Sequence, residues 1–327
     1  MITALVTGGT GFVGSHVARA LVRHGYRVRI LRRATSRLDA IADLDCEHAT
    51  GDVMDPASLA AAMEGVDWVF HVAAVADYWR SDPARIYTIN VDGTRNVLLA
   101  AEAAGVRRVI FTSSAAAMGY RADMRPVDES VRFNYDQHVT PYGHSKFLAE
   151  AEVYRAIRRG LDCVILNPTV IIGPGDLNQI SSSVIVEAAR GNVPPTVPPG
   201  GLTLIDVRDV AEAHVAAAER GRTGERYLLG AVDLTHKAWL RLTAHTVGRR
   251  MMALTLPAWL VRRVAVVADV LRRSGVPLPI EGNQLRLSTN MMFFDCRKSW
   301  RELGPPQIPI QQSLRDTYAW YRAHGDL

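Results

Sequence analysis

The sequence predicts an α/β protein built on a doubly wound parallel sheet, with a smaller lobe towards the C-terminus. Three observations carry this prediction. Short β-branched runs alternate with longer helical patterns in the first half of the chain, and a glycine-rich turn follows the first run. After Pro168, proline and glycine clusters separate shorter elements. With 327 residues, 48% of them hydrophobic and 22% charged, the chain has ordinary globular composition and room for two such units.

Six strands and four helices are expected in the first half. The strands are short apolar runs bounded by polar or turn residues, at Ile2–Thr7, Tyr26–Leu31, Cys46–Ala49, Asp67–Val72, Arg108–Thr112 and Asp162–Leu166. Helical patterns fill the gaps, at Gly11–His24, Pro56–Glu64, Pro83–Ala104 and Pro141–Arg159. Because crossovers between parallel strands are right-handed, this alternation favours one sheet with helices on both faces.

In the second half, Leu204–Val207 and Arg226–Leu229 are expected as strands, with a helix over Val210–Glu219 between them. This pattern resembles that of the first half, so some of these elements are expected to return to the sheet domain. We therefore predict a sheet domain over residues 1–167 and a lobe formed mainly by residues 168–327.

The charge and the cysteines exclude several classes of protein. The net charge is +5 without a long basic run, which favours a phosphate-bearing ligand over a nucleic-acid partner. Cys46, Cys163 and Cys296 have no paired spacing, so neither a disulfide framework nor a metal site is expected.

No stretch reaches the length of a membrane span. The closest, residues 256–271, is interrupted by Arg262, Arg263 and Asp269. An amphipathic helix packed on the lobe is favoured there over a helix lying on a membrane surface. The N-terminus runs straight into the first strand without a signal-peptide pattern, which predicts a cytoplasmic protein.

Residues 7–14 read TGGTGFVG, between the first strand and the first helix. Gly8 permits the tight turn, Gly11 lets the backbone approach a pyrophosphate, and Gly14 allows close packing of helix and strand. The helix N-terminus then directs its N–H groups at the anion. This placement predicts a dinucleotide-binding, Rossmann-type domain whose loop holds the cofactor through Gly8, Thr10, Gly11, Phe12 and Val13.

The end of the second strand is where a carboxylate would bind the ribose 2′-hydroxyl of NAD. The chain instead carries Arg32 and Arg33, which suit the 2′-phosphate of NADP. NADP(H) is therefore favoured, with NAD(H) as the alternative. One of the two arginines is enough for this contact, and the other would then lie in solvent.

Three further segments are expected near the cofactor. Asp52 and Val53 follow the third strand, where the carboxylate can accept a hydrogen bond from the adenine amino group. Ala73 and Ala74 follow the fourth strand and are small enough to let backbone approach the cofactor. For His71, a satisfied core histidine is favoured over a catalytic one.

Tyr142 and Lys146 are four residues apart on a predicted helix, which places both side chains on one face. A neighbouring ammonium stabilises a phenolate and so makes tyrosine a better proton donor to a carbonyl oxygen. Ser113 and Ser114 end the fifth strand and bring hydroxyls to the same edge of the sheet. The order of these motifs after the glycine loop predicts a catalytic constellation.

Together these motifs resemble the extended short-chain dehydrogenase/reductase family, also called the NAD-dependent epimerase/dehydratase family. The matching segments extend over nearly the whole chain, at residues 7–14, 51–52, 71–74, 90–94, 112–114, 142–146, 167–169 and 294–304. Within the family, residues 71–79, 145–150 and 224–230 look most like the dihydroflavonol-4-reductase-like branch, which includes hopanoid-associated proteins labelled sugar epimerases.

The resemblance implies a Ser–Tyr–Lys triad of Ser114, Tyr142 and Lys146, with Ser113 as second choice for the serine. Tyr142 and Lys146 would also contact the cofactor, Lys146 through the nicotinamide ribose, and Asn90 would support that side of the site. A further segment would lie beside the nicotinamide: Asn167, Pro168, Thr169 and Val170. Family members often dimerise through the helices at Pro83–Ala104 and Pro141–Arg159, so a homodimer is expected on this ground.

Two positions separate a reductase from a sugar epimerase. Nucleotide-sugar epimerases often place an arginine for the diphosphate where this chain has Leu202, and a histidine where it has Asp206. These departures weaken the epimerase interpretation, since a diphosphate would lose a charge-assisted hydrogen bond. Another arginine, Arg208, Arg222 or Arg226, could supply the contact instead, although Arg208 is followed by a helical pattern and can be explained as a surface charge.

The predicted pocket suits an apolar or aromatic carbonyl compound, because its candidate residues are Tyr78, Trp79, Met118, Phe133 and Tyr135. For each of them, packing is an equally good explanation. The residues expected at the substrate are Tyr78, Ser114, Met118, Tyr142 and Thr169. The sequence thus favours an NADP(H)-dependent oxidoreductase that reduces a ketone or aldehyde, or oxidises the alcohol. The alternatives are a nucleotide-sugar epimerase or dehydratase and, less favoured, a non-catalytic NADP-sensing protein.

Overall fold

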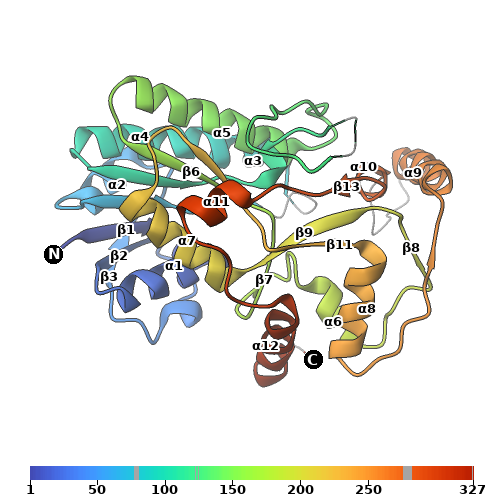
Figure 1. Cartoon of the computed structure of the whole chain (residues 1–327). Helices are drawn as coiled ribbons and strands as arrows, with labels where there is room; N and C mark the ends of the chain where they lie inside the picture. The colour runs from blue at the N-terminus through green and yellow to red at the C-terminus, as the bar shows by residue number, and fades with distance from the viewer. Residues whose placement is uncertain (77–80, 122, 124, 275–281, 326) are drawn as a thin grey trace.

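The computed structural model describes residues 1–76, 81–121, 123, 125–274, 282–325 and 327. Across these residues the main sheet has seven strands, all paired in parallel, in the order β10-β6-β5-β4-β1-β2-β3 (Figure 1). The strands are β1 (Thr3–Thr7), β2 (Arg27–Arg32), β3 (Glu47–Thr50), β4 (Trp68–His71), β5 (Arg108–Thr112), β6 (Cys163–Pro168) and β10 (Arg226–Leu229). This is the Rossmann-like parallel sheet that the sequence predicts, so the fold class is confirmed.

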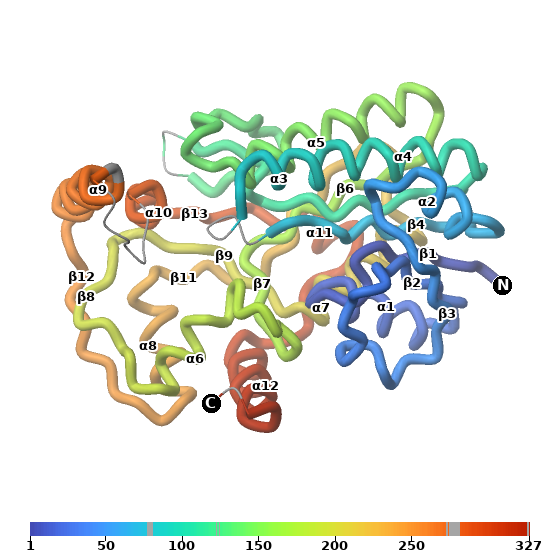
Figure 2. The backbone as a smooth tube through the Cα atoms, turned by 180° about the vertical axis from the view of Figure 1, so that it is seen from behind, coloured from blue at the N-terminus to red at the C-terminus, as the bar shows by residue number. Residues whose placement is uncertain are grey.

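Helices cover both faces of this sheet. One face packs against α1 (Phe12–Arg23) and α7 (Val207–Arg220), and the other against α2 (Pro56–Met63), α4 (Gly93–Ala103) and α5 (Pro141–Arg158). Figure 2 shows α2, α4 and α5 together above the sheet and α1 below it. Each face has its own apolar core, in which Leu21 and Ile30 lie on one side and Leu5 and Phe111 on the other. Because helices bury both faces of the sheet, its strands have continuous apolar sequences and not alternating ones.

The predicted helix at Pro83–Ala104 is interrupted by a π-helical turn. Residue Asp82 caps α3 (Pro83–Tyr87) by accepting a hydrogen bond from the N–H of Ala84, and α4 begins at Gly93. The residues between them, Thr88–Asp92, form the π turn. Turns of this kind are rare and recur at functional sites, and here the turn carries the buried Asn90.

The second half of the chain forms a lobe beside the sheet and also contributes to the sheet itself. The lobe sheet consists of β7 (Val170–Ile172), β9 (Gly201–Asp206), β11 (Val232–Thr235) and β13 (Met291–Met292), and a separate strand pair is β8 (Thr196–Val197) with β12 (Leu254–Thr255). Its helices are α6 (Ser183–Ala189), α8 (His236–Thr246), α9 (Ala258–Arg273), α10 (Gly282–Leu287) and α12 (Ile310–Ala323), whereas α11 (Arg297–Glu302) lies against the main sheet.

Three elements from beyond residue 167 return to the main sheet. Strand β10 pairs with β6, α7 packs on the face that α1 also covers, and α11 packs against β10. The strand expected at Leu204–Val207 is part of β9 and belongs to the lobe sheet. Among the described residues, no helix is both long enough and apolar enough to cross a membrane.

Gly14 is required by the packing of α1 on the turn after β1. A Cβ atom at this position would lie 2.1 Å from the carbonyl oxygen of Gly8, well inside contact distance. Gly8 itself has a φ of +70°, in the left-handed region that favours glycine. At Gly11 the nearest described atom to a Cβ would be the same oxygen at 3.3 Å, so an alanine there needs only a small adjustment.

We predict that Gly14→Ala lowers the free energy of unfolding by about 2 kcal/mol or more, because backbone has to move away from the new methyl group. Gly11→Ala is the matched control and should cost less than about 1 kcal/mol. Urea denaturation of both variants measures the difference. Equal stabilities would contradict the close approach of α1 to Gly8.

Candidate active site

The predicted site residues come from several strand ends and one helix. In a parallel sheet all carboxyl ends lie at the same edge, so the segments after β1, β4, β5 and β6 meet there. Helix α5 begins with Pro141 at its first position. Its start lies at this edge, where Lys146 donates to the carbonyl oxygen of Thr112 at the end of β5. Tyr142 and Lys146 are both in its first two turns.

The two serines after β5 have different surroundings. Ser113 is buried, and its hydroxyl donates to a carboxylate oxygen of Glu150 at 2.5 Å. Ser114 is partly exposed, and its Oγ accepts a hydrogen bond from the N–H of Ala116 at 3.1 Å. Because Ser114 acts there as an acceptor, its hydroxyl hydrogen remains available for a ligand. This geometry favours Ser114 over Ser113 as the serine that contacts a substrate oxygen.

Lys146 is only 2% exposed, although it carries an ammonium group. Its Nζ donates to the carbonyl oxygen of Thr112 at 2.7 Å and lies 4.9 Å from the centre of the Phe111 ring. Burial lowers the pKa of Lys146 to about 7, and the negative charge of Glu150 opposes that shift. A lysine held in this way has a fixed position and a proton that is exchanged near neutral pH.

Glu150 connects α5 to three strand ends, a role that the sequence analysis did not assign. One carboxylate oxygen accepts from Ser113 Oγ and from Asn167 Nδ2 at 2.6 Å, and the other pairs with Arg226 at 3.4 Å. Burial raises the pKa of Glu150, while these three donors oppose the shift. The available signal was the four-residue spacing from Lys146, which places both side chains on the same face of the helix.

The segment after β6 is held at the sheet edge by its own hydrogen bonds. Asn167 donates to the carbonyl oxygen of Ser114 as well as to Glu150, and its buried Oδ1 has no hydrogen-bond partner among the described residues. Both the N–H and the hydroxyl of Thr169 donate to the carbonyl oxygen of Leu229. Pro168 is opposite Leu229 in the β6–β10 pairing, and Val170 begins β7.

Asn90 positions the backbone around the site. Its Oδ1 accepts from the N–H of Val75 at 2.8 Å, and its Nδ2 donates to the carbonyl oxygen of Val75 and to Ser145 Oγ. Both amide hydrogens of Asn90 are thus used within the protein. The side chain therefore links the chain after β4 to helix α5, which supports the site without leaving a donor for the cofactor.

His71 is a core histidine, as the sequence analysis favours. Its ring nitrogens are hydrogen-bonded to the hydroxyl groups of Thr7 at 2.8 Å and Thr94 at 3.0 Å. Burial, together with the charge of Lys146, lowers the pKa of His71 to about 3. The neutral ring therefore joins β1, β4 and α4 and takes no part in proton transfer near neutral pH.

The glycine loop fits the pyrophosphate of a dinucleotide. Gly11 caps α1 without a side-chain hydrogen bond, and the first turn of the helix carries no acidic residue. Its N–H groups are therefore left to face an anion. Thr10, Phe12 and Val13 are partly exposed around this turn, and Ala73 lies so close to the loop that a Cβ on Gly8 would be 2.8 Å from its N and Cα atoms.

At the end of β2, Arg32 and Arg33 make no ion pair within the described part of the chain, and the Nε of Arg32 is buried without a hydrogen-bond partner. The nearby Arg37, by contrast, pairs with Asp39 at 2.9 Å. Two cations without counter-charges at this strand end fit a 2′-phosphate.

The adenine side of the predicted site lies after β3. One oxygen of Asp52 accepts from the N–H of Met54 at 2.9 Å, and the carboxylate keeps further acceptor positions. Val53 is buried against Gly93 at the start of α4, and Ala74 remains partly exposed after β4.

The predicted pocket residues separate into three groups. Tyr78 and Trp79 lie outside the described residues. Met118 is 1% exposed and packs with Val127 and Phe294, which favours a packing role. The ring of Phe133 stacks on Phe147 with centroids 5.5 Å apart, on the side of α5 away from Tyr142, so it also packs.

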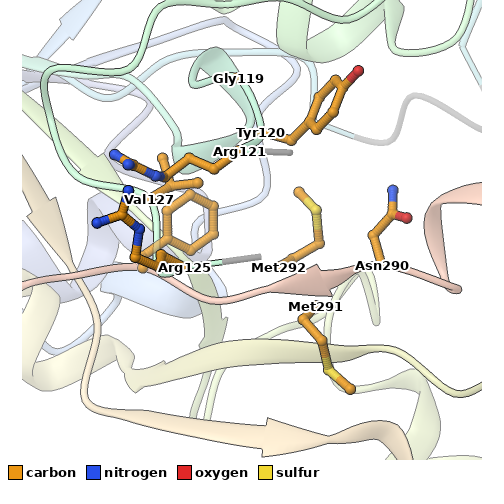
Figure 3. Close-up of a pocket in the computed structure, with 9 residues that line it drawn as sticks. Gly119, Tyr120, Arg121, Arg125, Val127, Asn290, Met291 and Met292 are labelled. Carbon is orange, nitrogen blue, oxygen red and sulfur yellow. The ribbon is translucent and has the colours of Figure 1, made fainter. Parts of the chain in front are cut away.

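Tyr135 lies beside a small pocket, which Figure 3 shows between the chain after Met118 and strand β13. Its hydroxyl donates to Met292 Sδ at 3.3 Å, and its ring is 5.2 Å from that of Tyr120. The pocket has a volume of about 50 Å³, room for water or one small group. Its lining residues are Gly119, Tyr120, Arg121, Arg125, Val127, Asn290, Met291, Met292 and Phe294.

The positions that separate a reductase from a sugar epimerase have structural roles here. Leu202 packs in the apolar core of the lobe. Asp206 is fully buried, caps α7 by accepting from the N–H of Arg208 at 2.7 Å, and pairs with the same guanidinium at 2.8 Å. Arg208 also pairs with Asp316 at 2.8 Å.

The other two arginines that could replace the missing one are also engaged. Arg222 pairs with Glu302 at 2.9 Å, and Arg226 pairs with Glu150 and donates to the carbonyl oxygen of Glu129. All three arginines considered as replacements, Arg208, Arg222 and Arg226, therefore already have partners within the chain.

A dinucleotide-binding sheet with a Tyr–Lys helix at its carboxyl edge is the architecture of short-chain dehydrogenases/reductases. The chain belongs to the NAD-dependent epimerase/dehydratase family, whose model matches residues 4–230. The resemblance found in the sequence is thereby confirmed.

Proteins of several names are similar over the whole chain. A protein of Synechocystis sp. named "Putative dihydroflavonol 4-reductase" is 38% identical, over 98% of this chain and 94% of its own. Sterol demethylase protein B of Methylococcus capsulatus is 32% identical, over 99% of this chain and 99% of its own. The crystal structure of gox2253 is 39% identical, covers both chains completely and superposes with a TM-score of 0.89.

We predict that Lys146→Met stabilises the folded protein at pH 7 in the absence of ligands, because methionine fills a similar volume without a buried charge. The folded-state pKa is lowered, so the unfolded wild type binds more protons between about pH 7 and pH 10.5. Wild-type stability should therefore rise relative to the variant by up to about 1.4 kcal/mol per pH unit in that window.

Urea denaturation at pH 7, 8 and 9 measures both effects. The advantage of Lys146→Met should be largest at pH 7 and should shrink at each higher pH. A variant that is less stable than the wild type at pH 7, or a gap independent of pH, would show that burial does not lower the pKa of Lys146.

Proposed function

We propose that this protein is an NADP(H)-dependent oxidoreductase that reduces a ketone or aldehyde on an apolar or aromatic small molecule, or oxidises the corresponding alcohol. The observation that carries the proposal is the buried Lys146, held by Thr112 one helical turn from Tyr142. A charged group that is expensive to bury, at the edge where a dinucleotide would end, is explained by chemistry rather than by stability.

When bound, the nicotinamide supplies or accepts a hydride. The chain's own residues then handle the proton and the carbonyl oxygen. Tyr142 donates its phenolic proton to that oxygen, and the ammonium of Lys146 stabilises the phenolate that remains. Ser114 donates its free hydroxyl hydrogen to the same oxygen and stabilises the charge that develops there.

Two observations support a reductase over a nucleotide-sugar epimerase. Leu202 replaces the expected diphosphate-binding arginine, and the three candidate replacements are all engaged in ion pairs, which leaves a substrate diphosphate without its expected partner. The similar proteins include one named as a putative dihydroflavonol 4-reductase and a sterol demethylase protein, and both names refer to ring compounds and not to nucleotide sugars. An apolar ring compound bearing a carbonyl or hydroxyl group is therefore the substrate class we propose.

The direct test follows nicotinamide absorbance with purified protein, a panel of aromatic, steroid and aliphatic carbonyl compounds, and NADPH or NADH. We expect NADPH consumption with an apolar carbonyl compound. Tyr142→Phe should lower kcat by about 100-fold or more while cofactor affinity is retained, because the proton donor is lost. Epimerisation of a nucleotide sugar without net cofactor consumption, or no turnover of any compound, would contradict the proposal.

The arginines after β2 give a separate prediction on the cofactor. Arg33→Ser should raise the KM for NADPH by about 10- to 100-fold, because a charge-assisted contact with the 2′-phosphate is lost, and should leave the KM for NADH unchanged. Arg37→Ser is the matched control, since Arg37 already pairs with Asp39. Equal effects of Arg33→Ser on NADPH and NADH would contradict a 2′-phosphate contact.

A further inference from the structure

Exposed apolar side chains are concentrated on one segment of the lobe. Half of the large hydrophobic residues that are exposed in the described part of the chain lie between residues 252 and 271. They are Met252, Leu254, Trp259, Val264, Val266, Val267, Val270 and Leu271, and we call them the α9 patch. Trp259 is 65% exposed and Leu254 is 73% exposed. A cluster of exposed apolar side chains of this kind on a folded protein marks a binding surface.

Helix α9 is apolar on the face that packs and also on the face that does not. Val261, Ala265 and Ala268 are buried and lie on one side of the helix, towards α10, where a Cβ on Gly282 would be 2.7 Å from the carbonyl oxygen of Ala265. The 3.6-residue period places Trp259, Val266 and Val270 in a stripe away from this side, with Val264, Val267 and Leu271 beside it. Packing among the described residues therefore does not account for the outer face.

The position of α9 leaves this face accessible. Figures 1 and 2 show α9 at the outer end of the lobe, far from the main sheet, and among the described elements α10 and the strand pair β8–β12 lie near it. Met252 and Leu254 directly precede the helix on the β12 side, so the patch continues from the strand onto the helix.

The charge of the same segment is strongly one-sided. Residues 236–274 contain eight lysines and arginines and one acidic residue, a net charge of +7 against +5 for the whole chain. The single carboxylate, Asp269, is paired with Arg286. Arg249 and Arg250 are exposed before the patch, and Arg262 is exposed on its flank. Arg263, also exposed, lies between Val267 and Val270 around the helix, from where its long side chain can reach lipid headgroups. A mainly apolar face that carries one arginine, with further arginines beside it and a tryptophan at one end, matches an anionic lipid surface in both chemistry and charge.

We propose that α9 docks the protein on the surface of an anionic lipid bilayer, with the helix lying in the interfacial plane and the α9 patch facing the acyl chains. The arginines would contact lipid headgroups. The helix has 16 residues and two arginines in its middle, so it lies on the bilayer and does not cross it. This inference goes beyond the proposed reaction and does not depend on it.

The test is co-sedimentation of the full chain with vesicles of phosphatidylcholine alone or with about one third phosphatidylglycerol. We expect binding to the anionic vesicles, and weaker binding when NaCl is raised from about 0.1 M to 0.5 M. The double variant Val267→Glu with Val270→Glu should bind at least about tenfold more weakly, because two carboxylates replace apolar contacts.

The matched control places the same two charges on exposed leucines outside the patch, Leu177→Glu with Leu327→Glu, and should bind like the wild type. Far-UV circular dichroism and thermal unfolding check that both double variants are folded. The proposal is overturned if the wild type does not bind anionic vesicles or if both double variants bind alike. It is also overturned if light scattering shows that Val267→Glu with Val270→Glu only separates a dimer, which would assign the patch to a second copy of the chain.

Discussion

The buried carboxylate of Glu150 is the interaction on which the rest of the site depends. It joins α5 to the ends of β5, β6 and β10 through Ser113, Asn167 and Arg226. A rigid helix that is anchored in this way cannot slide along the sheet without breaking several buried hydrogen bonds at once. These hydrogen bonds fix how α5 is placed and rotated on the sheet, and they thereby fix the positions of Tyr142 and Lys146. Since β10 comes from beyond residue 167, the same carboxylate also binds the two halves of the chain together.

The carboxyl edge of the sheet is polar and buried, whereas the layers behind it are apolar. His71 with its two threonine partners, Asn90 with Val75, and Lys146 with Thr112 form a hydrogen-bonded layer from which water is largely excluded. Hydrogen bonds are stronger in such surroundings, and unpaired groups are more costly. The layer therefore holds its members in single positions, which is what proton transfer over a short distance requires.

Features that depend on local spacing could be predicted from the sequence, and features that depend on distant partners could not. The strands of the first half follow from short continuous apolar runs, the glycine loop from glycines three residues apart, and the Tyr–Lys helix from a four-residue spacing. The partners of Glu150 lie 37, 17 and 76 positions away, so no local pattern could indicate them. The π turn at Thr88–Asp92 was predicted as ordinary helix for the same reason. The sequence does not distinguish a single apolar residue that lines a pocket from one that packs in a core. Met118 packs in a core.

The π turn before α4 has a consequence for the phase of the helix. A π turn holds one residue more than the α-helical turn it replaces, and one residue corresponds to about 100° of rotation in a regular helix. Without that residue, everything before it would rotate by this angle relative to α4, and Asn90 could not face both Val75 and Ser145 while Thr94 faces His71. One extra residue thus lets one continuous helical segment direct side chains at two neighbours that lie at different angles around its axis.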